Sequence, residues 1–258
     1  MGLGSDYNEL SLTDMARRGG GNYYFIGNTA ELPTVLAGEL KTLQQLVARD
    51  AMLHVDLAPG VGVDQMYGFA HTRTDDNSLH IPLSAFHSGQ NKSLVLSLHL
   101  ADNSLAATVR PASFRLEYAD LVNDRRVSAP LAGADLVVVE ARQTPSGRVP
   151  VDVAAFAAAR NRDAVVRVER VKAAAAYDQA MERYEEGRQA EAQEILRGAS
   201  RNLRAASADL GGAPSLAAQA EEADVVADEA VRIDRKTTAG KKWLKGNRYD
   251  SYKLMLSK

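Results

Sequence analysis

The residues with the clearest potential for chemistry lie at the C-terminal end of the sequence. Residues 235–258 hold eight basic side chains and one acidic side chain, a net charge of +7 in a chain whose total charge is −2. Aromatic side chains are interleaved with these cations, as in proteins that bind nucleic acids or anionic lipids. The alternative is that this segment docks on the remainder of the chain, whose net charge is −9. Residues 236–258 are therefore predicted to form a basic aromatic tail whose candidate anion-binding residues are Lys241, Lys242, Trp243, Lys245, Arg248 and Tyr249.

The histidines are the second group that could support chemistry. They are His54, His71, His80, His87 and His99, and no two stand four residues apart, the spacing of a helical zinc site. Two or three of them could still meet across strands, so a hydrolase with a cross-strand histidine site is kept as a reserve hypothesis. The sequence has no cysteine and no Gly-x-Ser-x-Gly turn that would expose a serine nucleophile. We predict a protein that is not an enzyme, with no catalytic residue and no cofactor.

A third group lies near the N-terminus, where Asp6, Asn8 and Glu9 follow Gly2 and Gly4. Two carboxylates and an amide could hold a cation, but at the start of a helix they more often cap the helix and favour its first turn. The two glycines lack the third glycine and the preceding strand of a dinucleotide-binding loop. We expect helix capping here and no metal site.

Composition sets the background for these residues. Hydrophobic residues make up 45% and charged residues 25% of the 258-residue chain, which is close to the average for globular proteins. No apolar run approaches the roughly 20 residues that span a bilayer. The first residues lack a basic segment followed by an apolar one, so no signal peptide is expected in this chain. A sequence without cysteine fits an oxidising or a reducing compartment equally well.

Residues 1–50 have the pattern of alternating helices and strands. A short helix is expected over Glu9–Arg18, ended by glycines, and a buried strand over Asn22–Ile26. A longer helix is predicted by apolar residues at three- and four-residue steps: Leu32, Val35, Leu36, Leu40, Leu43, Leu46 and Val47. This order indicates an α/β unit.

The pattern of residues 51–145 predicts a β domain. Short segments with period-two alternation are separated by turn residues, a spacing typical of an antiparallel β-sandwich. The predicted strands are Met52–Leu57, Gln65–Phe69, Ser78–Leu83, Ser93–Leu100, Ser113–Tyr118 and Leu136–Ala141. Pro145-Ser146-Gly147 is expected to be the linker that follows.

Residues 146–235 are alanine-rich and helical, and three antiparallel helices are expected in a bundle. One stretch resembles a single tetratricopeptide unit: Ala180, Tyr184, Gly187, Ala192, Leu196 and Ala199. Small residues would let two helices approach, and the glycine would make the turn between them. Since one repeat cannot form a peptide groove, this pattern is interpreted as a packing device. Ala174 is expected to lie off the apolar stripe.

The first residues also resemble a known family. Gly2-Leu3-Gly4-Ser5-Asp6-Tyr7-Asn8-Glu9, Arg18-Gly19-Gly20-Gly21-Asn22-Tyr23-Tyr24-Phe25-Ile26 and Glu31-Leu32-Pro33 resemble the end of a von Willebrand factor type A domain. The likeness is to bacterial proteins in which this domain precedes a β domain and a helical segment. It implies that residues 1–50 correspond to the last helix, strand and helix of a doubly wound α/β sheet.

The resemblance also implies that the metal site of the family is absent. That site uses an Asp-x-Ser-x-Ser loop, a threonine and an aspartate, all from earlier parts of the domain, and the loop motif does not occur in this sequence. Three explanations stay open. The chain is a fragment or begins at an internal methionine, a separate polypeptide supplies the other strands, or the remnant has been reused.

Together these patterns predict a multidomain α+β protein: a type A remnant over 1–50, a β-sandwich over 51–145, a helical bundle over 146–235 and the tail over 236–258. The predicted function is that of a non-catalytic scaffold or adhesion-type protein that makes metal-independent contacts with a protein partner. The alternative is a nucleic-acid or anionic-membrane adaptor that acts through the tail.

Overall fold

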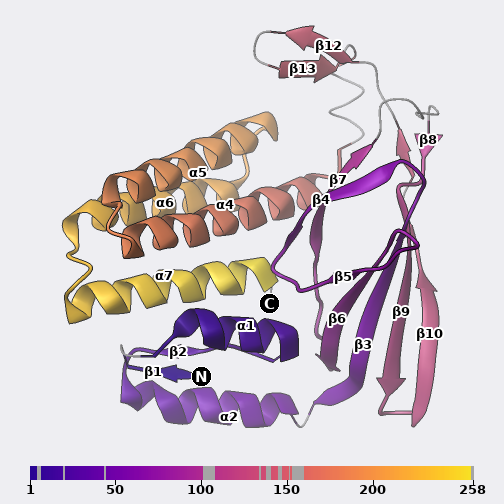
Figure 1. Cartoon of the computed structure of the whole chain (residues 1–258), viewed down its shortest axis with the longest axis horizontal. Coiled ribbons are helices and arrows are strands. Elements are labelled where there is room, and N and C mark those ends of the chain that lie inside the picture. Colours follow the sequence, from indigo (N-terminus) through magenta and orange to yellow (C-terminus); the bar gives the residue numbers. More distant parts are fainter. Residues whose placement is uncertain are drawn as a thin grey trace.

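The computed structural model places the helices on one side of the molecule and the long β-sheet on the other (Figure 1). It describes residues 1–258 apart from 5–6, 20, 44, 101–107, 134, 138–140, 145–146, 151, 153–159 and 257–258. Among the helices described, none combines the length and apolar character needed to cross a bilayer.

The N-terminal residues form a small α/β unit. Strand β1 (Gly2–Leu3) pairs in parallel with β2 (Phe25–Ile26), and α1 (Glu9–Gly19) makes the crossover between them. A single 3-10 turn, η1 (Thr29–Glu31), leads into α2 (Leu32–Leu43). Helices α1 and α2 lie on opposite sides of the strand pair (Figure 1). Asn8 caps α1 by accepting a hydrogen bond from the Ser11 N–H at 3.0 Å, as expected from the sequence.

Two boundaries in this unit differ from the prediction. Strand β2 covers only the last two residues of the segment expected to be extended. Helix α2 ends at Leu43, and the chain re-enters a strand at Leu46, so Leu46 and Val47 lie in β3 rather than in the helix. Their helical spacing was misleading because pairing of β3 with β6 and β9 determines the local conformation.

The β region contains one large antiparallel sheet and several pairs of strands. The five-stranded sheet has the order β10-β9-β3-β6-β5, and a second sheet pairs β4 with β7. Apolar side chains from both sheets share one core, in which Val55, Leu79 and Ile81 are fully buried. The strands of these two sheets are β3 (Leu46–Leu57), β4 (Val61–Tyr67), β5 (Thr72–Arg73), β6 (Ser78–His87), β7 (Val95–Leu100), β9 (Ala112–Asp120) and β10 (Arg125–Leu131).

Three smaller features complete this region. Strand β8 (Thr108–Val109) pairs with β11 (Leu136–Val137), and β12 (Ala141–Thr144) pairs with β13 (Gly147–Pro150). Strand β10 had not been predicted, and the predicted strand Leu136–Ala141 falls partly outside the described residues. Of the predicted linker, only Gly147 is described, and it lies in β13.

The C-terminal part is a bundle of four helices, where three had been expected. They are α4 (Arg162–Glu185), α5 (Gln189–Asp209), α6 (Pro214–Arg232) and α7 (Thr238–Leu256). Five of the six tetratricopeptide-like residues are buried: Ala180, Tyr184, Ala192, Leu196 and Ala199. Gly187 is exposed and adopts a positive φ of 87° in the turn between α4 and α5. The fourth helix, α7, is built from the residues predicted to be a tail.

Candidate functional site

The predicted anion-binding tail is a helix whose aromatic and basic residues are partly inside the protein. Trp243 packs against Tyr184 of α4, with ring centroids 4.7 Å apart, and its indole N–H donates to Glu229 of α6 at 2.7 Å. Leu244 belongs to the same core cluster as Tyr184. Packing against α4 and a hydrogen bond to α6, rather than solvation, therefore determine the conformation of residues 238–256.

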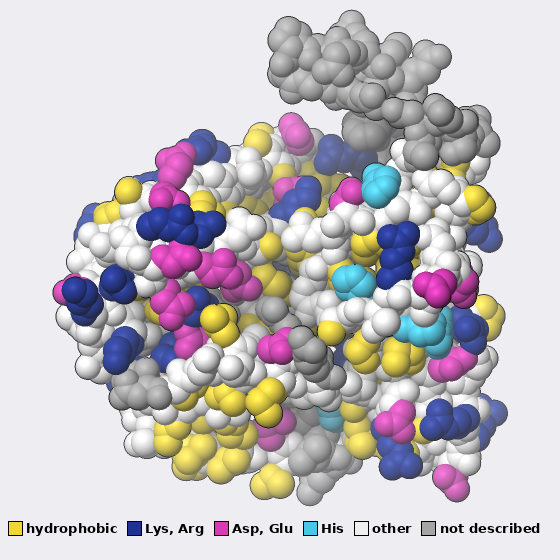
Figure 2. Space-filling view, in the orientation of Figure 1, with side chains coloured by type: hydrophobic (Ala, Val, Ile, Leu, Met, Phe, Trp, Pro, Cys, Tyr) yellow, Lys and Arg dark blue, Asp and Glu magenta, His cyan; other side chains and the backbone are white. Residues whose placement is uncertain are grey.

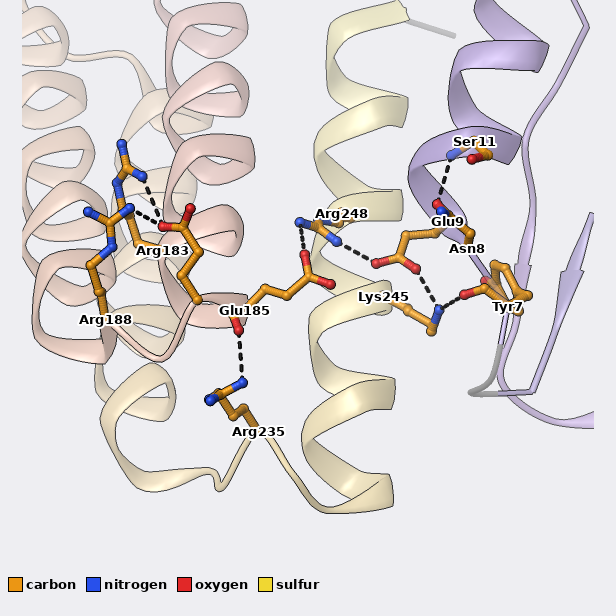
Figure 3. Close-up of polar contacts among 11 residues, drawn as sticks. Tyr7, Asn8, Glu9, Ser11, Arg183, Glu185, Arg188, Arg235, Lys245 and Arg248 are labelled. Carbon is orange, nitrogen blue, oxygen red and sulfur yellow. Dashed lines mark hydrogen bonds and ion pairs between the residues drawn. The ribbon is translucent and has the colours of Figure 1, made fainter.

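Two cations predicted as ligands for anions are buried and already paired within the chain (Figure 3). The Lys245 ammonium donates to Glu9 Oε2 at 2.6 Å and to the Tyr7 carbonyl at 2.5 Å. The Arg248 guanidinium lies between two carboxylates, contacting Glu9 on one side and Glu185 Oε2 at 2.8 Å on the other. These contacts join α1, α4 and α7, so they connect the N-terminal unit to the bundle.

The electrostatics of this cluster favour the charged forms. Burial by itself raises the pKa of Glu9, but hydrogen bonds from Lys245 and Arg248 outweigh it, and the pKa of Glu9 is lowered. Burial likewise opposes the charge of Arg248, yet its pKa is raised by Glu185 and Glu9. The charges of Lys245 and Arg248 are thus balanced by the carboxylates of Glu9 and Glu185. These ion pairs hold α1, α4 and α7 together.

A group of tyrosines lies beside this network. Tyr23 is buried, shares a hydrogen bond of 2.8 Å with the Tyr7 hydroxyl, and meets Tyr249 and Tyr252 edge to face, each at 5.8 Å between ring centroids. Burial, followed by the hydrogen bond with Tyr7, raises the pKa of Tyr23. Tyr24 donates to Glu39 of α2. The aromatic residues of α7 thus cover the chain just before β2 and do not form an open stacking surface.

The other cations of α7 remain at the surface. Lys241 and Lys242 are exposed, and Lys242 donates to the Gly27 carbonyl at 3.1 Å. Lys253 lies over the Tyr249 ring at 4.5 Å and pairs with Asp250. The concentrated patch of six residues expected from the sequence is therefore divided between a buried network and an exposed surface.

The histidines are only partly brought together. His54 of β3 and His80 of β6 are cross-strand neighbours whose rings meet edge to face at 4.6 Å, and His54 Nε2 lies 3.4 Å from Glu117. His99 contacts Asp64, and His87 contacts Gln90. Within the part of the chain that the structure describes, no three His, Cys, Asp or Glu side chains are grouped so that they could hold a metal. Of the N-terminal candidates, Asn8 is a cap, Glu9 is paired, and Asp6 lies outside the described residues.

A surface that sequence reasoning missed lies on the N-terminal unit. Leu36 and Leu40 of α2 are 43% and 63% exposed, Pro33 and Ala37 beside them are also exposed, and Leu3 of β1 is 52% exposed. Figure 2 shows hydrophobic side chains gathered at the lower left, where Figure 1 places α2. The sequence contains a signal for this surface, because apolar residues recur at helical spacing in this segment. That spacing alone does not show whether another part of the protein covers them.

Comparison with known proteins identifies the fold and not a family. No family model matches the chain, and no curated protein matches it. Among solved structures, the von Willebrand factor type A protein from Catenulispora acidiphila superimposes with a TM-score of 0.54 at 14% identity, over 88% of this chain and 56% of that one. Human COPII-coat protein Sec24c gives a TM-score of 0.47, also at 14% identity, over 98% of this chain and 32% of that one. The chain thus spans about half the length of the first protein and about a third of the second.

Proposed function

We propose that this chain is a non-catalytic scaffold or adhesion-type protein that makes protein–protein contacts without a metal ion. The observation that carries the proposal is the exposed apolar surface of α2, formed by Pro33, Leu36, Ala37 and Leu40, which we call the α2 stripe. None of the side chains described in α2 is buried, although this helix is rich in apolar residues. Contiguous exposed apolar surface of this kind marks interaction sites in proteins.

The architecture of the N-terminal unit supports a finer interpretation. A parallel strand pair with a helix on each face is the construction of a doubly wound sheet, and the fold is similar to that of the Catenulispora type A protein over 88% of this chain. We interpret residues 1–50 as the closing part of a type A-like domain, followed by a β-sandwich and a helical bundle. The Asp-x-Ser-x-Ser loop is not in the sequence, so binding through these residues uses side chains other than metal ligands.

The observations favour neither alternative. An adaptor for nucleic acid or anionic lipid would need the cations of α7, but Lys245 and Arg248 are engaged by Glu9 and Glu185. A histidine hydrolase would need a nucleophile held by an imidazole. Ser78, on the same sheet as the histidine pair, donates instead to Asp56 at 2.7 Å.

Site-specific photo-crosslinking tests the proposal. A photoreactive amino acid is placed at Leu40 in cells that produce the protein, and at Val225 as the control, since Val225 of α6 is exposed to a similar extent, 57%. We expect a discrete cross-linked protein from Leu40 and not from Val225. The complex should persist in lysate treated with EDTA, and Leu36→Asp should abolish it. Equal cross-linking at both positions, or a complex lost with EDTA, would contradict the proposal.

A further inference from the structure

We infer that His54 and His80 bind a divalent transition-metal ion, Cu²⁺ most tightly, on the face of the five-stranded sheet that points away from the core. This inference goes beyond the proposed function, because the two histidines lie on β3 and β6 and take no part in the α2 stripe. It depends on the register of the two strands, on the unpaired nitrogens of His54 and on the carboxylates beside the pair.

The register of β3 and β6 brings the two imidazoles together. His54 and His80 are direct partners in this antiparallel pair, so their side chains leave the same face of the sheet. Their neighbours Val55, Leu79 and Ile81 point the other way, into the core. Both histidines are half-buried rather than enclosed, so an ion in solution can reach the pair.

The ring of His54 has two nitrogens that the protein does not satisfy. Nδ1 and Nε2 are both buried, and among the described residues neither has a hydrogen-bond partner. Nε2 lies 3.4 Å from Glu117 Oε2, but the two groups are not aligned for a hydrogen bond. Buried polar groups are nearly always paired, and a bound ion is one of the arrangements that accounts for an exception. Neutral imidazole is also the commonest side-chain ligand of metal ions.

The separation of the two rings fits one ion between them. A metal-bound imidazole nitrogen lies about 2.0–2.1 Å from the ion, so two such rings hold their centres roughly 4.5 Å apart at a right angle and roughly 5.2 Å apart at a tetrahedral angle. The ring centres of His54 and His80 are 4.6 Å apart. Rotation about the side-chain torsions aims one nitrogen of each ring at a common point. The right-angled arrangement is that of tetragonal coordination, which is typical of Cu²⁺, and Cu²⁺ also has the highest affinity in the Irving–Williams order.

The charges around the pair favour a cation. A metal-binding histidine normally donates its other N–H to a carboxylate, and Glu117 is placed to accept from His54 Nε2 and leave Nδ1 for the ion. Arg115 is the partner of His54 on β9, but its guanidinium is paired with Glu117. Asp56 follows His54 by two residues on β3 and adds a second carboxylate to the same face. Two carboxylates therefore lie near the pair against one guanidinium, and this excess of negative charge favours a dication.

Two protein ligands and water hold the ion in this arrangement. The described residues include no group of three His, Cys, Asp or Glu side chains placed to hold a metal, so water completes the coordination. The ion links β3 to β6 and stabilises the folded state, since the unfolded chain does not hold the two histidines together. EDTA should reverse this stabilisation, because water-filled coordination positions leave the ion open to a chelator.

The experiment measures binding of Cu²⁺ to the full chain by calorimetry and counts the nitrogen ligands by electron paramagnetic resonance. We expect one ion that binds more tightly than any other and has two nitrogen ligands. Glu117→Gln should keep both nitrogens and weaken binding about tenfold, whereas His54→Gln and His80→Gln should each remove one nitrogen and weaken binding further. His71→Gln is the matched control at an exposed histidine and should change neither property. Circular dichroism verifies that each variant is folded.

A second measurement uses the parent chain alone, so it decides even where a variant does not fold. Cu²⁺ is paramagnetic, and below one equivalent it should broaden the NMR signals of His54 and His80 before all others. First broadening at His71, at His99 or at the N-terminus would overturn the inference. Two nitrogen ligands retained in His54→Gln, an equal loss of affinity in His71→Gln, or the absence of a bound ion would also overturn it. None of these results bears on the α2 stripe, which cross-linking at Leu40 tests separately.

Discussion

Glu9, in the first turn of α1, and Lys245, in the middle of α7, form a buried ion pair with 2.6 Å between carboxylate oxygen and ammonium nitrogen. They are 236 residues apart in the sequence. Because Arg248 contacts the same carboxylate, a single glutamate faces two cations on the last helix of the chain. The N-terminal unit is therefore held in place from the C-terminal end, across the intervening β region.

Removing the charge of Glu9 should destabilise the protein strongly. Glu9→Gln leaves the charges of Lys245 and Arg248 buried without enough negative charge beside them. We therefore expect the free energy of unfolding to fall by about 3–5 kcal/mol. Urea denaturation followed by circular dichroism measures this. Glu221→Gln, at an exposed position of α6, is the matched control and should leave the free energy nearly unchanged. Equal effects of the two substitutions would show that the network does not hold the elements together.

The same network predicts a dependence of stability on acid. The pKa of Glu9 is lowered from its ordinary value of 4.5 in the folded protein, so its contribution to stability is complete above about that pH. It is lost as the pH falls through the lowered pKa. The difference in unfolding free energy between the parent chain and Glu9→Gln should therefore narrow between pH 7 and pH 3. Other carboxylates titrate in both proteins and cancel in the difference. A difference that is constant with pH would contradict this assignment.

Trp243 reports directly on the conformation of α7. It is the only tryptophan in the sequence, and its packing against Tyr184 with a hydrogen bond to Glu229 predicts blue-shifted emission that is protected from iodide. Both properties should be lost in urea. Emission typical of water-exposed indole in the native protein would mean that residues 236–258 are the solvated tail expected from the sequence.

The contact between α4 and α5 should tolerate no added volume at Ala192. This residue is fully buried, so Ala192→Leu should lower the free energy of unfolding by about 1–3 kcal/mol through overpacking. Ala218→Leu, at an exposed position of α6, is the control and should have little effect. Thermal denaturation compares the two variants, and equal shifts in melting temperature would show that Ala192 does not lie at a close contact.

The sequence predicted the local features that depend on neighbouring residues. The cap at Asn8, the turn at Gly187 and the buried positions of Ala192 and Ala199 follow from residue type and local spacing. Ala174 shows the limit of the method. It was placed off the apolar stripe, yet it is fully buried, because α4 packs against α5, α6 and α7 and thus has more than one buried face.

The helix α7 could not be identified by hydrophobic spacing alone. Its buried positions recur at helical intervals, but two of them are Lys245 and Arg248, which a periodicity argument assigns to solvent. Their partners, Glu9 and Glu185, lie far away in the sequence, so only the tertiary structure shows that these charges are compensated. The contact of His54 with His80 was equally hidden, because it depends on the pairing register of β3 and β6.

The central claim is that the N-terminal unit is folded in this chain, with β1 paired to β2, so that α2 presents its stripe from a fixed position. Amide hydrogen exchange of the isolated protein, resolved by NMR at Leu3 and Gly4, tests it most directly. We predict that the Gly4 amide, which donates to Ile26, is protected and that the Leu3 amide exchanges much faster, because alternate residues of a strand direct their N–H groups to opposite edges. Equal and rapid exchange of both amides would mean that β1 is not paired with β2, and this result would contradict the account.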